Sequence, residues 1–104
     1  MVTIKLAKQK IEQLLADLRH EGYAPTRALL FGSVAKGRAH ELSDVDVAIW
    51  DEKFTGCKPI DYEHIAKILH RFPRVEVHTF HASETKRDNP FIGEIEKHGV
   101  AIPV

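Results

Sequence analysis

The chain has 104 residues, of which 43% are hydrophobic and 29% charged, as in a typical soluble globular domain. A chain of this length has little room for a second hydrophobic core, so we expect residues 1–104 to form one domain. Its 15 lysines and arginines balance its 15 aspartates and glutamates, so no overall positive charge would attract nucleic acid from a distance. The single cysteine, Cys57, excludes an internal disulfide and fits a reducing cytosol.

The N-terminal segment has the pattern of an amphipathic helix and not of a membrane segment. Apolar residues recur at helical spacing from Ile4 to Leu18, which predicts a helix over residues 4–20 that ends at Gly22. Lysines and other polar residues interrupt the segment every few positions, so it lacks the apolar run of a signal peptide or a membrane span. We therefore expect a cytoplasmic protein that does not enter a membrane.

Two strands are expected in the next part of the chain. The apolar run at residues 27–31 predicts a buried strand that closes at Gly32-Ser33, and residues 33–37 could form the first turn of a short helix. Residues 44–50 alternate in polarity and are rich in β-branched side chains, which is typical of a second strand. Residues 53–59 contain a glycine and a proline and are expected to form a loop.

The rest of the chain repeats this order of helix and strand. We expect a helix over residues 60–72 that Pro73 stops, a strand over 74–80, a polar loop over 81–89, a helix that begins at Asn89-Pro90 and ends at Gly99, and an edge strand over 100–102. This alternation predicts an α/β or α+β fold in which helices flank a mixed, mostly four-stranded sheet. The chain segments next to Ser33 and Asp44 should then lie at the same edge of the sheet.

Two aspartates separated by one residue, Asp44 and Asp46, form the first candidate site. Alternate side chains of a strand point to the same face, so both carboxylates are expected to point one way while Val45 and Val47 enter the core. Carboxylates at this spacing repel each other unless a cation lies between them, and Mg²⁺ prefers such oxygen ligands. Pairs of this kind are also common on solvated surfaces. Aspartate has a poor strand propensity, however, and two of them in a valine-rich strand favour a metal site.

Gly32-Ser33 is the second candidate, a site for an anion. A strand that ends in Gly-Ser and leads into a helix directs free backbone N–H groups and the serine hydroxyl towards an anion. Glycine also permits a phosphate to approach the backbone closely. Alone, the pair could equally be an ordinary strand-to-helix turn with Ser33 as the N-cap. Together with the two aspartates, it predicts a site for a nucleoside triphosphate and a divalent metal.

The sequence around these residues resembles the nucleotidyltransferase superfamily of DNA polymerase beta type, and within it the minimal nucleotidyltransferases. The pattern of that family is Gly-Ser-x-Ala-Arg-Gly, a spacer and Ser-Asp-x-Asp, and it is matched here by residues 32–37 and 43–46. Lys36 stands where the family has arginine; it could attract phosphate as a point charge but could not form two parallel hydrogen bonds. Arg38 could substitute for it, or both could be solvated surface residues.

The resemblance also implies a third carboxylate on a neighbouring strand, and Glu76 matches that position. Strand alternation places Glu76 and His78 on one face, so Glu76 can face the aspartate pair. The family has aspartate there, and the longer side chain leaves open whether Glu76 binds metal, acts as a base or does both. By resemblance, two Mg²⁺ ions would be held by the catalytic residues Asp44, Asp46 and Glu76, and the phosphates of ATP by Gly32, Ser33 and Lys36.

Other residues with chemical potential have simpler interpretations. His78 and His81 have a loose metal-ligand spacing, but no paired cysteines accompany them, so we do not expect a zinc site. His78 could touch the nucleotide if it lies on the Glu76 face, although a surface histidine is the simpler interpretation. Trp50 is expected to pack beneath a helix at the far end of its strand.

The resemblance implies a nucleotidyl transfer whose acceptor is supplied by a partner protein. Minimal nucleotidyltransferases typically accompany a helical HEPN-domain protein, often a ribonuclease toxin, and act as its antitoxin by moving AMP from ATP onto a tyrosine. Two alternatives stay open. The chain could be an inactive antitoxin that neutralises a HEPN partner by binding alone, or it could transfer the nucleotide to RNA or to a small molecule.

Overall fold

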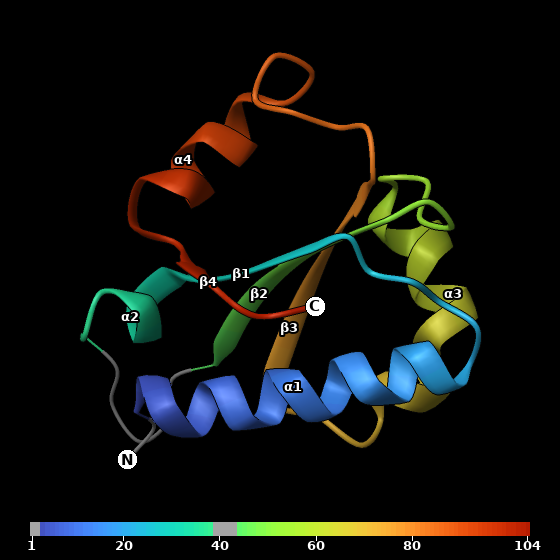
Figure 1. Ribbon diagram of the computed structural model, residues 1–104, viewed down its shortest axis with the longest axis horizontal. Helices are drawn as coiled ribbons and strands as arrows, with labels where there is room; N and C mark the ends of the chain where they lie inside the picture. The colour runs from blue at the N-terminus through green and yellow to red at the C-terminus, as the bar shows by residue number, and fades with distance from the viewer. Residues whose placement is uncertain (1–2, 39–43) are drawn as a thin grey trace.

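The computed structural model describes residues 3–38 and 44–104. Helices and strands alternate along the chain as the sequence predicts, in the order α1 (Ile4–His20), β1 (Arg27–Phe31), α2 (Gly32–Ala35), β2 (Val45–Asp51), α3 (Lys58–Leu69), β3 (Val75–His81), α4 (Pro90–His98) and β4 (Val100–Ala101) (Figure 1). Ser43, the first residue of the Ser-Asp-x-Asp match, lies outside the described residues. Within the described parts of the chain, no helix is long and apolar enough to cross a bilayer.

The four strands form one mixed sheet in the order β3-β2-β1-β4. β1 is antiparallel to both β2 and β4, whereas β2 and β3 are parallel and are joined through α3. This confirms the predicted fold class of a four-stranded mixed sheet flanked by helices. Because β2 and β3 are parallel and β1 runs the other way, the starts of β2 and β3 lie at the edge where β1 ends and α2 begins.

The sheet has a hydrophobic cluster on each face. The larger cluster lies beneath α1 and α3, and the strands contribute to it Ala28, Leu30, Val45, Val47, Ile49, Val75 and Val77. The five apolar residues of α1 that recur at helical spacing after Ile4 are fully buried there, whereas Ile4 itself is exposed. The alternation predicted for β2 therefore holds, because Val45, Val47 and Ile49 enter this core.

The smaller cluster lies beneath α4, on the opposite side of the sheet from α1 (Figure 1). Ile92 and Ile95 of α4 pack there with Trp50 and Phe80. The rings of Trp50 and Phe80 are stacked with their centroids 5.0 Å apart, and the indole N–H donates a hydrogen bond to the Glu84 carbonyl. Trp50 thus packs beneath a helix, as predicted.

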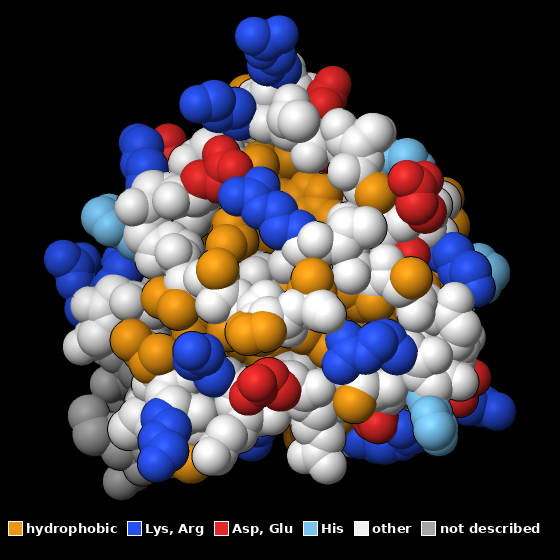
Figure 2. All heavy atoms as spheres, in the orientation of Figure 1, with side chains coloured by type: hydrophobic (Ala, Val, Ile, Leu, Met, Phe, Trp, Pro, Cys, Tyr) orange, Lys and Arg blue, Asp and Glu red, His pale blue; other side chains and the backbone are white. Residues whose placement is uncertain are grey.

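Charged side chains are dispersed over the face of the molecule that Figure 2 shows. Lysine and arginine side chains are scattered over this face, both at its outline and among the apolar side chains that lie across its middle. The basic side chains on this face therefore do not gather into one patch.

The boundaries of α3 differ from the prediction at both ends. The helix begins at Lys58, inside the predicted loop, because Pro59 is accommodated in the first turn, where its missing N–H is not needed. It ends at Leu69 and not at Phe72. The amides of Arg71 and Phe72 donate to carbonyls three residues earlier, which tightens the chain and ends the α-helical pattern before the proline.

The predicted ends of α1 and α4 are close to those observed. Gly22 follows α1 with a φ of 92°, a left-handed conformation that favours glycine at a helix end. The Asn89 side chain caps α4 by accepting a hydrogen bond from the Phe91 amide, and Pro90 occupies the first turn. Gly99 follows α4 in an extended conformation and leads directly into β4.

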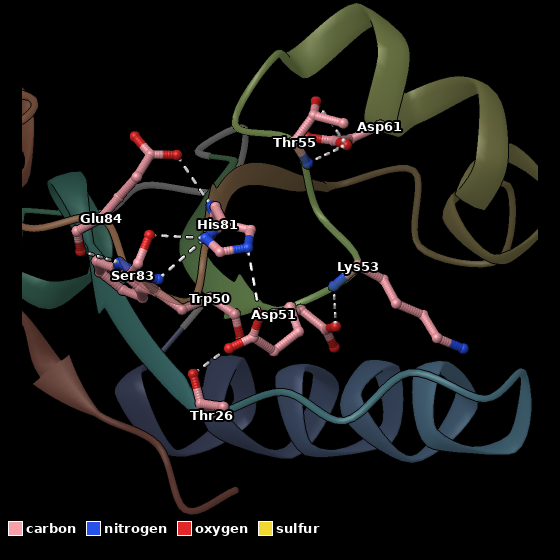
Figure 3. A network of polar contacts seen from close by, with 10 residues as sticks. Thr26, Trp50, Asp51, Lys53, Thr55, Asp61, His81, Ser83 and Glu84 are labelled. Atoms are coloured by element: carbon pink, nitrogen blue, oxygen red, sulfur yellow. Dashed lines mark hydrogen bonds and ion pairs between the residues drawn. The ribbon is translucent and has the colours of Figure 1, made fainter.

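Two buried carboxylates, Asp51 and Asp61, accept hydrogen bonds from neighbouring chain segments near the end of β2 (Figure 3). Asp51 accepts hydrogen bonds from the amides of Ala24 and Lys53, both at 2.8 Å. Asp61 of α3 accepts from the amides of Thr55 and Gly56 and from the hydroxyls of Thr55 and Thr79. Sequence analysis did not identify Asp61, because its role depends on the conformation of the preceding turn and on Thr79 of β3, which lies 18 residues further along the chain.

Replacing Asp61 by alanine should destabilise the protein by about 2–4 kcal/mol, because several buried or half-buried donors would lose their acceptor together. The free energy of unfolding can be measured from urea denaturation followed by circular dichroism. The matched control is Glu63→Ala, an exposed position on the same helix, which should change the stability by less than about 0.5 kcal/mol. Equal effects of the two substitutions would contradict the anchoring role of Asp61.

Candidate metal and nucleotide site

The site is built on the register of β2 against its two neighbours. Asp46 pairs with Phe31 of β1 and with Glu76 of the parallel strand β3. Neighbouring strands lie about 4.8 Å apart, so paired residues project side by side from one face of the sheet. Glu76 therefore lies beside Asp46, as strand alternation suggested. His78, two residues further along β3, projects from the same face.

Three side chains at this edge could together hold a metal ion. Asp46, Glu76 and His78 each offer one ligand atom, and these atoms all lie within 4.8 Å of one another. The Nε2 atom of His78 lies 3.7 Å from Oδ1 of Asp46 and 4.0 Å from Oε2 of Glu76. Metal–ligand bonds of about 2.0–2.2 Å separate adjacent ligands by roughly 3 Å and opposite ligands by about 4 Å. The observed separations fit a divalent ion with only small movements of the side chains.

The environment of His78 supports the same fit. Its Nε2 atom is shielded from solvent and has no hydrogen-bond partner among the residues that the structure describes. Only 20% of the side chain is exposed, so His78 is half-buried and not the fully exposed histidine of the simpler interpretation. Its ring contacts Phe31 of β1 and Phe91 of α4, with centroids 4.9 and 5.7 Å away. Sequence reasoning missed this burial because the covering ring comes from α4, which lies on another part of the chain.

Asp44 lies beside this group of three but is not part of it. β2 begins at Val45, so Asp44 precedes the strand and is exposed. Strand alternation applies only within a strand and therefore does not fix the direction of the Asp44 side chain. Asp44 instead lines a hollow of about 330 Å³ together with Glu76, Lys58 and Tyr62.

Lys58, at the start of α3, balances part of the negative charge of the site. Its Nζ atom lies 2.8 Å from Oε1 of Glu76, which leaves Oε2 facing His78. This hydrogen bond is the main reason why the pKa of Glu76 lies below its ordinary value, and burial opposes it. Burial lowers the pKa of Lys58, but the interactions with Glu76 and Tyr62 together outweigh this effect and raise the pKa above its ordinary value. Both groups are therefore held in their charged forms.

The Gly32-Ser33 turn lies directly against Asp46. Gly32 has a φ of 79°, and a β-carbon added there would collide with Oδ2 of the Asp46 carboxylate. The turn begins α2, whose first amides have no acceptor within the helix, as at every helix start. The structure thus brings the predicted anion site at Gly32 into contact with Asp46. The sequence alone does not indicate that these two residues touch.

A hollow of about 340 Å³ lies beside the turn, between α2 and α4. It is lined by residues of several types, namely Phe31, Gly32, Lys36, Phe91, Glu94, Ile95, Lys97 and His98. Lys36 and Arg38 are exposed, and both line a second hollow together with His98. Lys36, which follows α2, and Lys97 of α4 therefore line the space next to Gly32, where Lys97 is paired with Glu94. Lys97 and His98 were not identified from the sequence, because only the packing of α4 brings them here.

A helix-flanked mixed sheet with a metal-capable group next to a Gly-Ser turn defines a nucleotidyltransferase-like domain. Residues 9–103 match the family described as Polymerase beta, Nucleotidyltransferase, and the chain belongs to this family. No protein of curated function matches the chain by sequence.

Solved structures share the fold at low sequence identity. One is a toxin–antitoxin complex with AMP-PNP; its matching chain is 22% identical with a TM-score of 0.62, over 90% of this chain and 70% of that one. Another is a protein from Sulfolobus solfataricus whose assignment as a nucleotidyltransferase is itself provisional. It is 21% identical with a TM-score of 0.54, over 93% of this chain and 76% of that one.

Gly32 and Gly37 provide a matched test of the close approach to Asp46. Both have positive φ, so alanine at either position should cost about 1–2 kcal/mol of stability through backbone strain. At Gly37 a β-carbon meets no atom of residues 3–38 and 44–104 within 4 Å, whereas at Gly32 it meets the carboxylate. Gly32→Ala should therefore cost at least about 1 kcal/mol more than Gly37→Ala in urea unfolding. Equal costs would show that Asp46 can move away freely.

The Lys58 hydrogen bond can be tested through the titration of Glu76. In Lys58→Met, the pKa of Glu76 should rise towards its ordinary value of 4.5, because the largest cause of its depression is lost. The pKa can be followed by NMR of the Glu76 carboxyl carbon. In the control Lys67→Met, an exposed position on the same helix, the pKa should not change.

The same substitution has a defined effect on stability. A depressed folded-state pKa stabilises the protein above the unfolded-state pKa, and this contribution disappears as the pH falls through the folded-state value. Lys58→Met should therefore be less stable than the wild type at neutral pH, by less than about 1 kcal/mol because the ion pair is exposed to solvent. The difference should fade as the pH falls below about 4.5. A difference that persists in strong acid would contradict this origin.

Proposed function

We propose that residues 1–104 act as a single nucleotidyltransferase domain of the minimal type, which moves AMP from ATP onto a hydroxyl of a partner protein. The acceptor would be a tyrosine of a helical HEPN-domain toxin, so that the chain would act as its antitoxin in the cytoplasm. The observation that carries the proposal is the metal-capable group on β2 and β3 in contact with the Gly-Ser turn of α2. The likeness to a toxin–antitoxin complex with AMP-PNP supports a toxin–antitoxin partner and an adenine nucleotide. The HEPN identity of the partner rests on the sequence resemblance.

The negative side chains of the site would bind divalent cations. Asp46 and Glu76 would hold one Mg²⁺ ion, and Asp44, which shares a hollow with Glu76, would help to hold a second. When bound, such ions make the acceptor hydroxyl more acidic and neutralise charge on the reacting phosphates. The fit rests on the ligand separations at the start of β2 and β3.

The residues around the Gly-Ser turn would bind the nucleotide. The lack of a side chain at Gly32 lets the Asp46 carboxylate lie against the turn. The Ser33 hydroxyl and the free amides of α2 would donate hydrogen bonds to the terminal phosphates. Lys36 would add a positive charge at the mouth of the same hollow. The nucleotide would then lie on the side of the site next to α4. The acceptor could approach from the opposite side, through the hollow that Asp44 and Glu76 line.

In the proposed reaction, the acceptor oxygen forms a bond to the α-phosphorus of ATP while the bond to the β-phosphate oxygen breaks, and pyrophosphate leaves. The depressed pKa of Glu76 keeps this carboxylate ionised but makes it a weak proton acceptor. This favours a role for Glu76 in holding the cation over a role as general base, and the hydroxyl proton would pass to solvent.

The test is transfer of label from α-labelled ATP to the purified HEPN partner in the presence of Mg²⁺. Asp46→Asn and the double variant Asp44→Asn/Asp46→Asn should lower the rate more than about 100-fold, because they remove charge that acts in the transition state. The control Glu12→Gln, an exposed position on α1, should transfer label at the wild-type rate. Transfer that persists in the double variant would contradict the assigned metal site.

The alternatives give different results in the same experiments. If the double variant still neutralises the toxin in cells and the wild type transfers no label, the chain acts by binding alone. Labelled RNA or labelled small molecules in a reaction without partner would point to a different acceptor.

A further inference from the structure

We propose that His78 is a direct ligand of the cation held by Asp46 and Glu76, and that this nitrogen makes the site prefer a first-row transition ion such as Mn²⁺ to Mg²⁺. The inference rests on the proposed function, since it concerns the same site. It adds to that function a ligand of another chemical type and a preference among metals.

The position of the His78 ring is the first argument. Nε2 faces both carboxylates, at 3.7 Å from Asp46 and 4.0 Å from Glu76, and these distances are too long for direct hydrogen bonds. The same atom is shielded from solvent and has no other partner. Buried ring nitrogens are rarely left without a partner, and a cation between the three groups would satisfy this one.

The packing around His78 is the second argument. Phe31 and Phe91 hold the imidazole between β1 and α4, with ring planes inclined at 64° and 60° to it. A ring confined on two sides is already oriented towards the carboxylates. Preorganisation of this kind favours binding, because little side-chain freedom is lost when the metal arrives.

The charge balance around Glu76 is the third argument. Lys58 engages Oε1 of Glu76, and Oε2 remains directed towards His78. The ammonium group therefore fixes the carboxylate without occupying the space between Glu76, Asp46 and His78. A cation could enter that space while the ion pair with Lys58 persists.

The donor set determines which cation suits the site. Mg²⁺ binds oxygen ligands and gives up its water reluctantly, so a nitrogen ligand adds little to its affinity. Imidazole binds first-row transition ions well. The affinity of a site with nitrogen and oxygen ligands for these ions generally rises along the series from Mn²⁺ to Cu²⁺. Two carboxylates and one imidazole should thus favour Mn²⁺ or Zn²⁺ over Mg²⁺ more strongly than three carboxylates would.

The alternative is that His78 only packs between two phenylalanines, and the substitution His78→Phe separates the two roles. Phenylalanine preserves an aromatic ring between Phe31 and Phe91 but has no nitrogen to offer. The control is His64→Phe, which makes the same chemical change at an exposed position on α3. Urea unfolding of both variants would establish that they are folded before metals are added.

The experiment uses the whole chain with Mn²⁺ alone, without nucleotide. Pulsed electron paramagnetic resonance detects coupling between bound Mn²⁺ and a directly coordinated nitrogen. We expect this coupling in the wild type and in His64→Phe, and its loss in His78→Phe. Calorimetry should show Mn²⁺ binding weakened at least about tenfold in His78→Phe, with a smaller change for Mg²⁺.

The outcomes separate this inference from the proposed function. Bound Mn²⁺ without nitrogen coupling in the wild type would overturn the inference, even if His78→Phe fails to fold. Equal Mn²⁺ affinities of the wild type and His78→Phe would overturn it as well. Nitrogen coupling together with an absence of label transfer would support the ligand role of His78 and count against the transferase proposal alone.

Discussion

The pairing of β2 with β3 places two carboxylates, Asp46 and Glu76, side by side on the sheet, and the site depends on how their repulsion is relieved. Like charges on adjacent strands destabilise a sheet. Lys58 relieves part of the repulsion through one oxygen of Glu76, and the other oxygen remains available. The remaining negative charge next to a shielded, unpartnered nitrogen of His78 is an environment that a cation would stabilise.

The fold could be predicted largely from local patterns. Helical spacing of buried residues defined α1, and Gly22 and the Asn89-Pro90 pair indicated where helices end or begin. These signals depend on residues within a few positions of each other, so a single sequence contains them. The start of α3 was misplaced because a proline stops a helix in its interior but is tolerated in its first turn, and sequence alone did not distinguish the two cases at Pro59.

The site could be predicted only in part, because it is assembled across strands. The resemblance to a family pointed to Glu76, but only the register of β3 against β2 sets it beside Asp46. The sequence suggests a surface position for His78, because the ring of Phe91 that packs against it lies 13 residues later in the chain, on α4. Asp44 differs from Asp46 because the strand begins between them, a boundary that the alternating pattern does not reveal.

β2 carries a carboxylate at each end, and the two serve opposite purposes. Asp46 points to the α4 face and remains partly open to solvent, whereas Asp51 points to the other face and is closed off by backbone amides. Their side chains leave opposite faces because the two positions differ by an odd number along a strand whose side chains alternate. Deletion or insertion of a single residue between them would turn one carboxylate to the wrong side of the sheet. The length of this strand is therefore constrained independently of the identity of its residues, and length variation in related chains should be confined to the connections outside it.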